Sequence, residues 1–158
     1  MKNLFNLSIL NPNGSKFVQS INQYNKMATI FTKIANGEIP SYKIAESETH
    51  IAFLDINPIA AGHTLVVPKK EIDYLFDLSD SLLSETMLFA KKVALGMDRS
   101  LNPIRTGIIV EGLEVPHAHI HLVPIYEEHQ NVSLRNKVEI TKEKMAELAA
   151  TISKEVKL

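Results

Sequence analysis

Residues 115–124 read VPHAHIHLVP and place three of the chain's six histidines, His117, His119 and His121, at strict alternation. Successive side chains of a β-strand point to opposite faces of the sheet. The alternating pattern therefore predicts a strand with three imidazoles on one face. The apolar residues between and after the histidines lie on the other face, where they can pack on a core.

Three kinds of chemistry suit imidazoles that share one face. They can ligate a zinc ion with an open fourth position. One of them can attack phosphorus and form a covalent intermediate, while its neighbours orient the ring and pass a proton. They can also be structural, with their nitrogens satisfied by backbone groups. Burying three polar rings without a role is costly, so a reactive or metal-binding site is favoured over a structural one.

Composition restricts the class of protein. The chain has 158 residues, 45% of them hydrophobic, which suits one domain with a sizeable core. The net charge of −1 and the lack of a long basic run give no reason to expect nucleic-acid binding. Cysteine is absent, which excludes disulfides and fits a reducing compartment, so we expect a cytoplasmic protein. No apolar run approaches the roughly 20 residues that span a bilayer, and no membrane association is expected.

The first 26 residues differ from the rest because they are rich in Asn, Ser and Gln. Their apolar stretch at 4–10 is short and interrupted, which makes a poor signal-peptide core. We expect residues 1–26 to be a disordered extension and residues 27–158 to form the folded domain, which ends in a helix.

Apolar periodicity and turn residues predict the elements in chain order. They are a helix at 28–36, strands at 41–47 and 50–54, a loop at 55–62, a strand at 63–68, a long helix at 79–99, strands at 106–112 and 115–124, and a terminal helix at 141–156. Short connections exclude parallel crossovers between the first strands, so the pattern favours an α+β fold with an antiparallel sheet. We expect 106–112 to be a central strand, joined by a tight turn at 112–114 to the histidine strand.

A nucleotide site is suggested by residues outside the triad. His63 opens the strand at 63–68 and joins the imidazoles if that strand lies beside theirs. Asp55 follows a strand end, where binding groups collect. An apolar slot that ends in this carboxylate can hold a nucleobase, with the ribose hydroxyls on Asp55. The apolar residues available for it are Ile30, Phe31, Ile34, Phe53, Leu54 and Ile56.

These residues resemble the histidine triad (HIT) family of nucleotide hydrolases and transferases. The triad stretch, IFTKIANGEIPS at 30–41 and FLDINPIAAGHTLVVPKK at 53–70 follow the family's order and spacing, and the likeness covers about 29–126. It is closest to small bacterial members that look like purine-nucleoside phosphoramidases. The resemblance implies a five-stranded antiparallel sheet with two main helices, and a homodimer in which the long helices pair.

The resemblance also implies a mechanism. His119 attacks the α-phosphate of a purine nucleotide conjugate, a nucleotidyl–histidine intermediate forms, and water releases the monophosphate. His117 and His121 orient His119 and contact phosphate, and His63 matches the family's upstream histidine. Asp55 matches the ribose-binding acid, and the six apolar residues named above match the base pocket. No cofactor is implied. The alternatives are a dinucleoside polyphosphate hydrolase, a metal-dependent hydrolase that uses the histidine cluster, and a non-catalytic nucleotide-binding module.

The chain departs from the family pattern in three places. Some members carry a cysteine zinc site at the first helix, whereas this chain has Thr32 and no cysteine, and we expect neither a metal nor more than a surface role for His50. Glu114 stands where a hydroxyl residue is common, and it favours a cationic leaving group such as an amine. The tryptophan-bearing tail of some phosphoramidases is missing, and a helix is predicted there instead.

Overall fold

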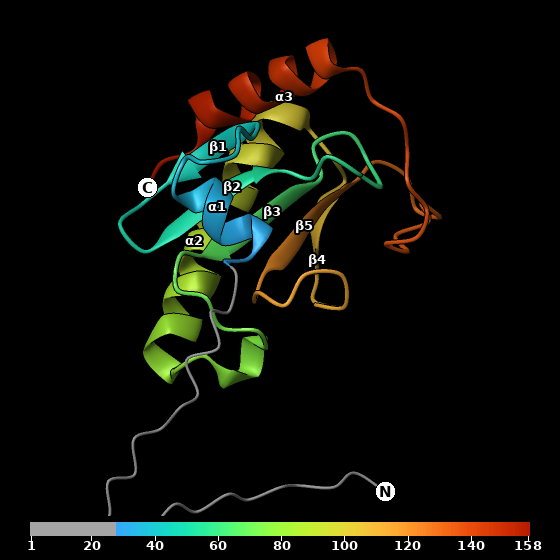
Figure 1. Ribbon diagram of the computed structural model, residues 1–158. Helices are drawn as coiled ribbons and strands as arrows, with labels where there is room; N and C mark the ends of the chain where they lie inside the picture. Colours follow the sequence, from blue (N-terminus) through green and yellow to red (C-terminus); the bar gives the residue numbers. More distant parts are fainter. Residues whose placement is uncertain (1–27) are drawn as a thin grey trace, which may run out of the picture.

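The protein folds as a five-stranded antiparallel sheet with helices on both faces, in a computed structural model that describes residues 28–158 (Figure 1). The strands run in the order β1-β2-β3-β5-β4 across the sheet, and every neighbouring pair is antiparallel. The predicted α+β class and five-stranded antiparallel sheet are confirmed. The extension expected at 1–26 lies outside the described residues.

The elements follow the predicted order. The strands are β1 (Lys43–Glu46), β2 (His50–Leu54), β3 (Thr64–Pro68), β4 (Arg105–Ile109) and β5 (Ile120–Ile125). The helices of the described residues are α1 (Ile30–Ala35), α2 (Asp80–Leu101) and α3 (Lys142–Glu155), with a 3-10 turn, η1 (Leu75–Asp77), before α2.

Side-chain caps fix where the long helices begin. Ser79 accepts a hydrogen bond from the backbone N–H of Leu82, and Thr141 accepts one from Lys144. Each cap satisfies a donor that has no partner within its helix. Asn102 ends α2 in the left-handed conformation, at φ 50°, which asparagine tolerates better than most residues.

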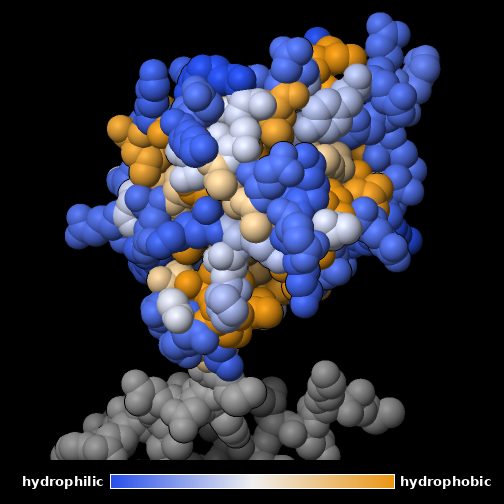
Figure 2. Space-filling model, turned by 90° about the horizontal axis from the view of Figure 1, so that it is seen from above, coloured by the Kyte–Doolittle hydropathy of each residue, from blue (hydrophilic) through white to orange (hydrophobic). Residues whose placement is uncertain are grey.

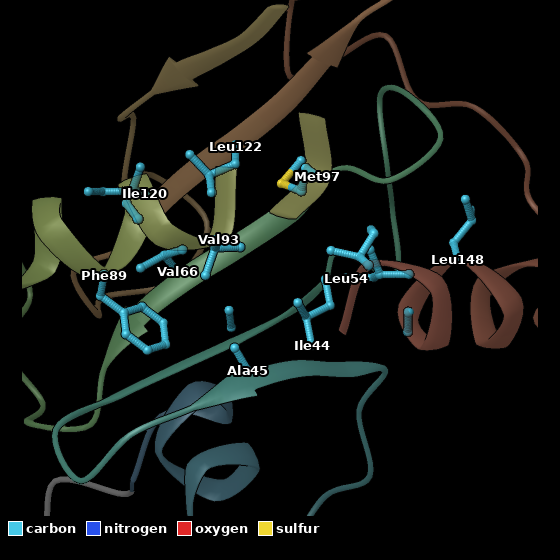
Figure 3. Close-up of a cluster of buried hydrophobic side chains, with 14 of the residues drawn as sticks. Ile44, Ala45, Leu54, Val66, Phe89, Val93, Met97, Ile120, Leu122 and Leu148 are labelled. Atoms are coloured by element: carbon cyan, nitrogen blue, oxygen red, sulfur yellow. The ribbon is translucent and has the colours of Figure 1, made fainter. Parts of the chain in front are cut away.

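Strand alternation gives the sheet two different apolar faces. The larger face packs against α2 and α3, and its side chains interdigitate with those of the helices (Figure 3). The residues buried there include Leu54, Val66, Phe89, Val93, Met97, Ile120, Leu122 and Leu148. The smaller face packs under α1 around Phe31. Full burial of one such side chain contributes about 1.5–3 kcal/mol, so the larger face supplies most of the stability and leaves the smaller one available for function.

The hairpin that carries the triad differs from its prediction in two ways. β5 begins only at Ile120, and residues 110–119 form a long connection instead of a tight turn. The backbone leaves the sheet here because the N–H of Ala118 donates to the carbonyl of Ile72 at 2.6 Å. β4 is an edge strand and not a central one, and Ile108 on it is 51% exposed.

His50 is buried, at 2% exposure, and the expectation of a surface residue is wrong. Its Nε2 lies 2.9 Å from the hydroxyl of Thr86, which itself donates to a backbone carbonyl, so Nε2–H donates to Thr86. Its Nδ1 lies 2.8 Å from the hydroxyl of Thr49 and accepts from it. The ring stacks on Phe89 at 5.3 Å. His50 therefore ties β2 to α2, and burial lowers its pKa.

The outer surface is mixed in polarity. Figure 2 shows hydrophilic side chains over most of one face, with separate hydrophobic patches between them. None of the helices among the described residues is long and apolar enough to cross a membrane.

Candidate active site

His119 has one ring nitrogen held by the backbone and the other open. Its Nδ1 lies 2.6 Å from the carbonyl oxygen of His117. A carbonyl only accepts, so the proton of the neutral ring is on Nδ1 and the lone pair is on Nε2. No hydrogen bond within the described residues engages Nε2, and no side-chain nitrogen there is both fully buried and unpartnered. The lone pair of His119 Nε2 therefore faces solvent, although the residue is only 6% exposed.

His63 and His121 form a hydrogen-bonded pair whose direction is set by the backbone. The N–H of Ile59 donates to His63 Nδ1 at 3.2 Å, so the proton of His63 is on Nε2. His63 Nε2 lies 3.0 Å from His121 Nδ1 and donates to it. His121 then carries its proton on Nε2. The rings of His119 and His121 are 4.8 Å apart, so the Nε2–H donor of His121 lies on a ring next to that of His119.

Burial keeps the imidazoles of His63, His119 and His121 neutral at pH 7. It lowers the pKa of His63 to about 4 and that of His121 to about 3, and it also lowers the pKa of His119. The neighbouring imidazoles lower the first two further, because a second positive charge is unfavourable in a desolvated cluster. A neutral ring is required for a nitrogen lone pair to attack.

Asp55 lies at the end of β2, next to His63. Its Oδ1 accepts from the backbone N–H of Asn57 at 2.8 Å, which fixes the carboxylate at the start of the loop. Its Oδ2 is 3.7 Å from His63 Nδ1. This contact is not an ion pair, because the distance is too long for a hydrogen bond and the neutral His63 ring accepts at Nδ1 from the N–H of Ile59. Burial raises the pKa of Asp55, and 13% of its side chain stays exposed.

His117 differs from the other two triad residues. It is fully buried, its Nε2 donates to the carbonyl of Pro68 at 2.8 Å, and its Nδ1 lies 2.7 Å from the hydroxyl of Thr29. Both ring nitrogens of His117 therefore have partners within the protein, which counts against the predicted phosphate contact. The predicted part of His117 in orienting His119 stays a prediction.

The structure assembles part of the predicted apolar slot. Phe31 lies edge-on to His119 at 5.0 Å and to Phe53 at 5.7 Å, and Ile34 packs on the same cluster. Leu54 faces the main core under α2, because it has the opposite parity to Phe53 on β2.

Two further predicted slot residues lie at the surface. Ile30 is 45% exposed and Ile56 is 70% exposed. Ile56 also lines a surface cavity of about 670 Å³ together with residues 137–141. The sequence analysis did not suggest that residues 137–141 lie close to Ile56.

Lys137 is a charged residue near the site that the sequence analysis did not single out. The positive charge of Lys137 lowers the pKa values of Asp55, His63 and His121. Its segment is held against the loop after β2 because the N–H of Val138 donates to Pro58 at 2.8 Å. No periodicity or motif marks this lysine in the sequence.

Glu114 has the opposite electrostatic effect to Lys137. Its negative charge raises the pKa values of His119 and Asp55, after the larger effects of burial. Glu114 itself is exposed, on the long connection before β5. The site is thus bordered by one carboxylate and one ammonium group.

Asp55, His63 and His121 also bring potential metal-ligand atoms within 4.8 Å of one another. The donor set fits a metal poorly as it stands, because His63 Nε2 and His121 Nδ1 share a hydrogen bond and His63 Nδ1 accepts from the backbone. A metal ion would have to break this pairing. The geometry therefore favours imidazole chemistry over metal ligation.

The sequence and the fold match known proteins. A family model described as HIT domain matches residues 36–128. An uncharacterized HIT-like protein of Borreliella burgdorferi is 37% identical over 132 residues, which cover 78% of this chain and 95% of the relative. Adenosine 5'-monophosphoramidase HNT1 of Saccharomyces cerevisiae is 41% identical over 98 residues, covering 61% of this chain and 62% of the relative. The solved structure of a hypothetical histidine triad nucleotide-binding protein of Sulfolobus tokodaii superposes with a TM-score of 0.71 at 28% identity, over 80% of this chain and 90% of that one.

Proposed function

Since this chain belongs to the HIT family, we propose that it hydrolyses purine nucleotide conjugates through a covalent intermediate on His119. The observation that carries the proposal is the 2.6 Å contact between His119 Nδ1 and the His117 carbonyl. It leaves the Nε2 lone pair open at a buried, neutral ring. That is the form of histidine that attacks phosphorus.

The bonds change in two steps. The lone pair of His119 Nε2 attacks the α-phosphorus, a P–N bond forms to the ring, and the bond from phosphorus to the leaving group breaks. An amine leaving group departs after taking a proton from solvent. Water then attacks the phosphorus, the bond to Nε2 breaks, and the nucleoside monophosphate is released with a proton returned to solvent. His121 Nε2–H donates to a phosphate oxygen and stabilises charge there.

Nucleotide recognition is assigned to groups around this centre. The Asp55 carboxylate accepts from the ribose hydroxyls, and the cluster of Phe31, Ile34 and Phe53 packs against the base. A phosphorus–nitrogen bond is the favoured target because the yeast relative is an adenosine 5'-monophosphoramidase.

The charges of Glu114 and Lys137 indicate which kind of leaving group the site favours. Glu114 and Lys137 both act on the site electrostatically, from the connection before β5 and from the segment after it. A cationic amine is favoured beside Glu114, and the anionic phosphate is favoured beside Lys137. A lysyl adenylate or lysyl phosphoramidate carries both charges, whereas a dinucleoside polyphosphate carries only the negative one.

The test is a turnover panel on chelator-treated protein. Adenosine phosphoramidate, a lysyl adenylate and a dinucleoside polyphosphate are incubated separately, and released monophosphate is measured. We expect turnover of the first two without added metal. Activity that is lost on chelation and restored by zinc supports the metal-dependent hydrolase instead. Binding of the monophosphate with no turnover of any conjugate supports the non-catalytic module, and preference for the dinucleoside substrate supports the polyphosphate hydrolase.

We also propose that the protein is a homodimer that pairs through α2 and the β4 edge. Leu88 on α2 is 60% exposed, as are 51% of Ile108 and 78% of Leu113. Exposed apolar residues beside an unpaired strand edge are typical of an interface. Sedimentation equilibrium at micromolar concentration should give a dimer, and Leu88→Glu should give a folded monomer. A monomeric wild type contradicts this assembly.

A further inference from the structure

The Nδ1 atom of His63 has two neighbours that require opposite states of it. The backbone N–H of Ile59 donates to this nitrogen at 3.2 Å, and Asp55 Oδ2 lies 3.7 Å from it. A donor requires a lone pair on Nδ1, whereas a carboxylate oxygen requires a proton there. The neighbour that is engaged therefore decides the tautomer of His63.

The tautomer of His63 is passed on to His121. Burial lowers the pKa values of the two rings to about 4 and about 3, so each neutral ring carries one proton. With Ile59 engaged, His63 Nε2–H donates to His121 Nδ1 at 3.0 Å, and His121 keeps its proton on Nε2. With Asp55 engaged instead, His63 Nε2 accepts from His121 Nδ1–H, and His121 Nε2 is left with a lone pair. A lone pair repels a phosphate oxygen, so only the first direction suits the proposed reaction.

The reversed direction is a strong competitor. A hydrogen bond from an imidazole to an ionised carboxylate is roughly twice as strong as a bond between neutral groups. Asp55 is held only through its other oxygen, Oδ1, which accepts from the N–H of Asn57 at 2.8 Å. Reversal would also turn Oδ2 of Asp55 away from the ribose and toward His63. The active direction therefore depends on how firmly the N–H of Ile59 is held in place.

Residues 126–138, called the strap below, run beside the loop between β2 and β3 (Figure 1). The hydroxyl of Tyr126 donates to the carbonyl of Ala61 at 2.8 Å. The backbone N–H of Val138 donates to the carbonyl of Pro58 at 2.8 Å. These two bonds hold the loop on either side of the residue whose N–H sets the tautomer.

Leu134 of the strap packs on that residue directly. It contacts the buried cluster of Ile59, Ala60 and Val123. Ile59 is only 3% exposed, so its side chain is covered and its backbone N–H stays directed at the ring of His63. The strap thus acts on the imidazoles through the packing and the backbone bonds of the loop.

We propose that the strap, chiefly through Leu134, holds the N–H of Ile59 in place and so keeps the proton of His121 on Nε2. Leu134 is a positioning residue, because it acts on the reacting phosphate only through the loop and the two rings. The inference rests on the proposed function for its effect on turnover, but the tautomers can be observed without any substrate.

The protonation test is nitrogen-15 NMR of the histidine rings in the substrate-free protein at pH 7. His63 and His121 should both be protonated on Nε2 in the wild type. In Leu134→Ala, where Ile59 loses its packing, both rings should shift toward the form protonated on Nδ1. Val132→Ala is the matched control, because Val132 is 39% exposed on the same strap and should leave the rings unchanged. A wild-type His121 protonated on Nδ1, or unchanged rings in Leu134→Ala, overturns the inference.

The kinetic test follows the hydrolysis of adenosine phosphoramidate. Complete loss of one donor to developing charge costs about 10²- to 10³-fold in kcat, and we expect partial reversal in Leu134→Ala to cost roughly 10-fold. KM should rise as well, because Asp55 then faces the ring and not the ribose. Val138→Pro, which removes the N–H donor to Pro58, should act in the same direction, whereas Val138→Ala keeps that N–H and should stay close to wild type. This pair carries the test if urea unfolding shows that Leu134→Ala is not folded.

The two tests separate this inference from the proposed function. Equal activity of Leu134→Ala and Val132→Ala, or a loss of kcat in Leu134→Ala without any change in the rings, overturns the inference. Rings that behave as expected in a protein without turnover support the role of the strap and refute the proposed function.

Discussion

His119→Ala should lose nucleotide turnover by about 10⁴- to 10⁶-fold, because the substitution removes the only proposed nucleophile. The loss should lie in kcat, since the base and ribose contacts do not involve this ring. Hydrolysis of adenosine phosphoramidate in single-turnover and steady-state assays measures it. The fold should survive, because the His119 ring lies on the smaller face of the sheet and the main core lies on the other.

A matched control is available in the same chain. His129 is an exposed histidine outside the cluster. His129→Ala should keep full activity, and both variants should unfold at wild-type urea concentration. A His119→Ala protein that retains a tenth of the wild-type rate, or a His129→Ala protein that loses as much as His119→Ala does, contradicts the assignment.

Stability should fall steeply as the pH is lowered from 7 to 5. The folded-state pKa values of His63 and His121, about 4 and about 3, lie below the ordinary value of 6.5. Between 6.5 and these values the unfolded chain binds more protons than the folded one, so the free energy of unfolding rises with pH. At pH 5 each of these two histidines lowers the free energy of unfolding by about 2 kcal/mol relative to pH 7. That is a large share of the roughly 5–15 kcal/mol by which domains are stable.

Asp55 has the opposite effect on how the free energy of unfolding depends on pH. Its pKa is raised by burial, so the folded state takes up this proton before the unfolded state does, which reduces the loss at the acid end. Urea unfolding at pH 7 and pH 5 tests the net effect. The difference should shrink in His63→Asn, which removes one buried imidazole, and should persist in His129→Ala. Equal or greater stability at pH 5 in the wild type rules the account out.

The sequence predicted the elements that short-range patterns define. The period of two in 117–121 separates the imidazoles from Ile120 and Leu122, and the structure keeps that separation although the strand starts only at Ile120. The order of helices and strands followed from apolar spacing and turn residues. The spelling of 63–68 indicated burial on both faces, and all of β3 is buried.

The errors arose where a distant contact overrides the local pattern. The tight turn at 112–114 failed because the N–H of Ala118 bonds to Ile72, far away in sequence. His50 was predicted to be a surface residue because no residue close to it in the sequence indicates that Thr86 on α2 is its hydrogen-bond partner. Leu54 was assigned to the slot by its place beside Asp55, although its parity along β2 already pointed to the core.

The residues missed at the site share the same cause. Thr29 contacts the triad residue His117 although the two lie 88 positions apart in the sequence. Lys137 reaches the site because the segment after β5 folds back onto Pro58. The resemblance to a family supplied the roles of His119 and Asp55, whereas single-sequence patterns contain no signal for contacts of this range.

The most direct measurement of the central claim is mass spectrometry of a base-quenched reaction, because the P–N bond of a nucleotidyl–histidine is labile in acid. Wild-type protein mixed with adenosine phosphoramidate should carry one added nucleoside monophosphate, and peptide mapping should place it on His119. The adduct should be absent from His119→Ala and present in His129→Ala. Turnover in the wild type without any adduct under conditions that preserve phosphoramidate bonds, or an adduct on another residue, would contradict the account.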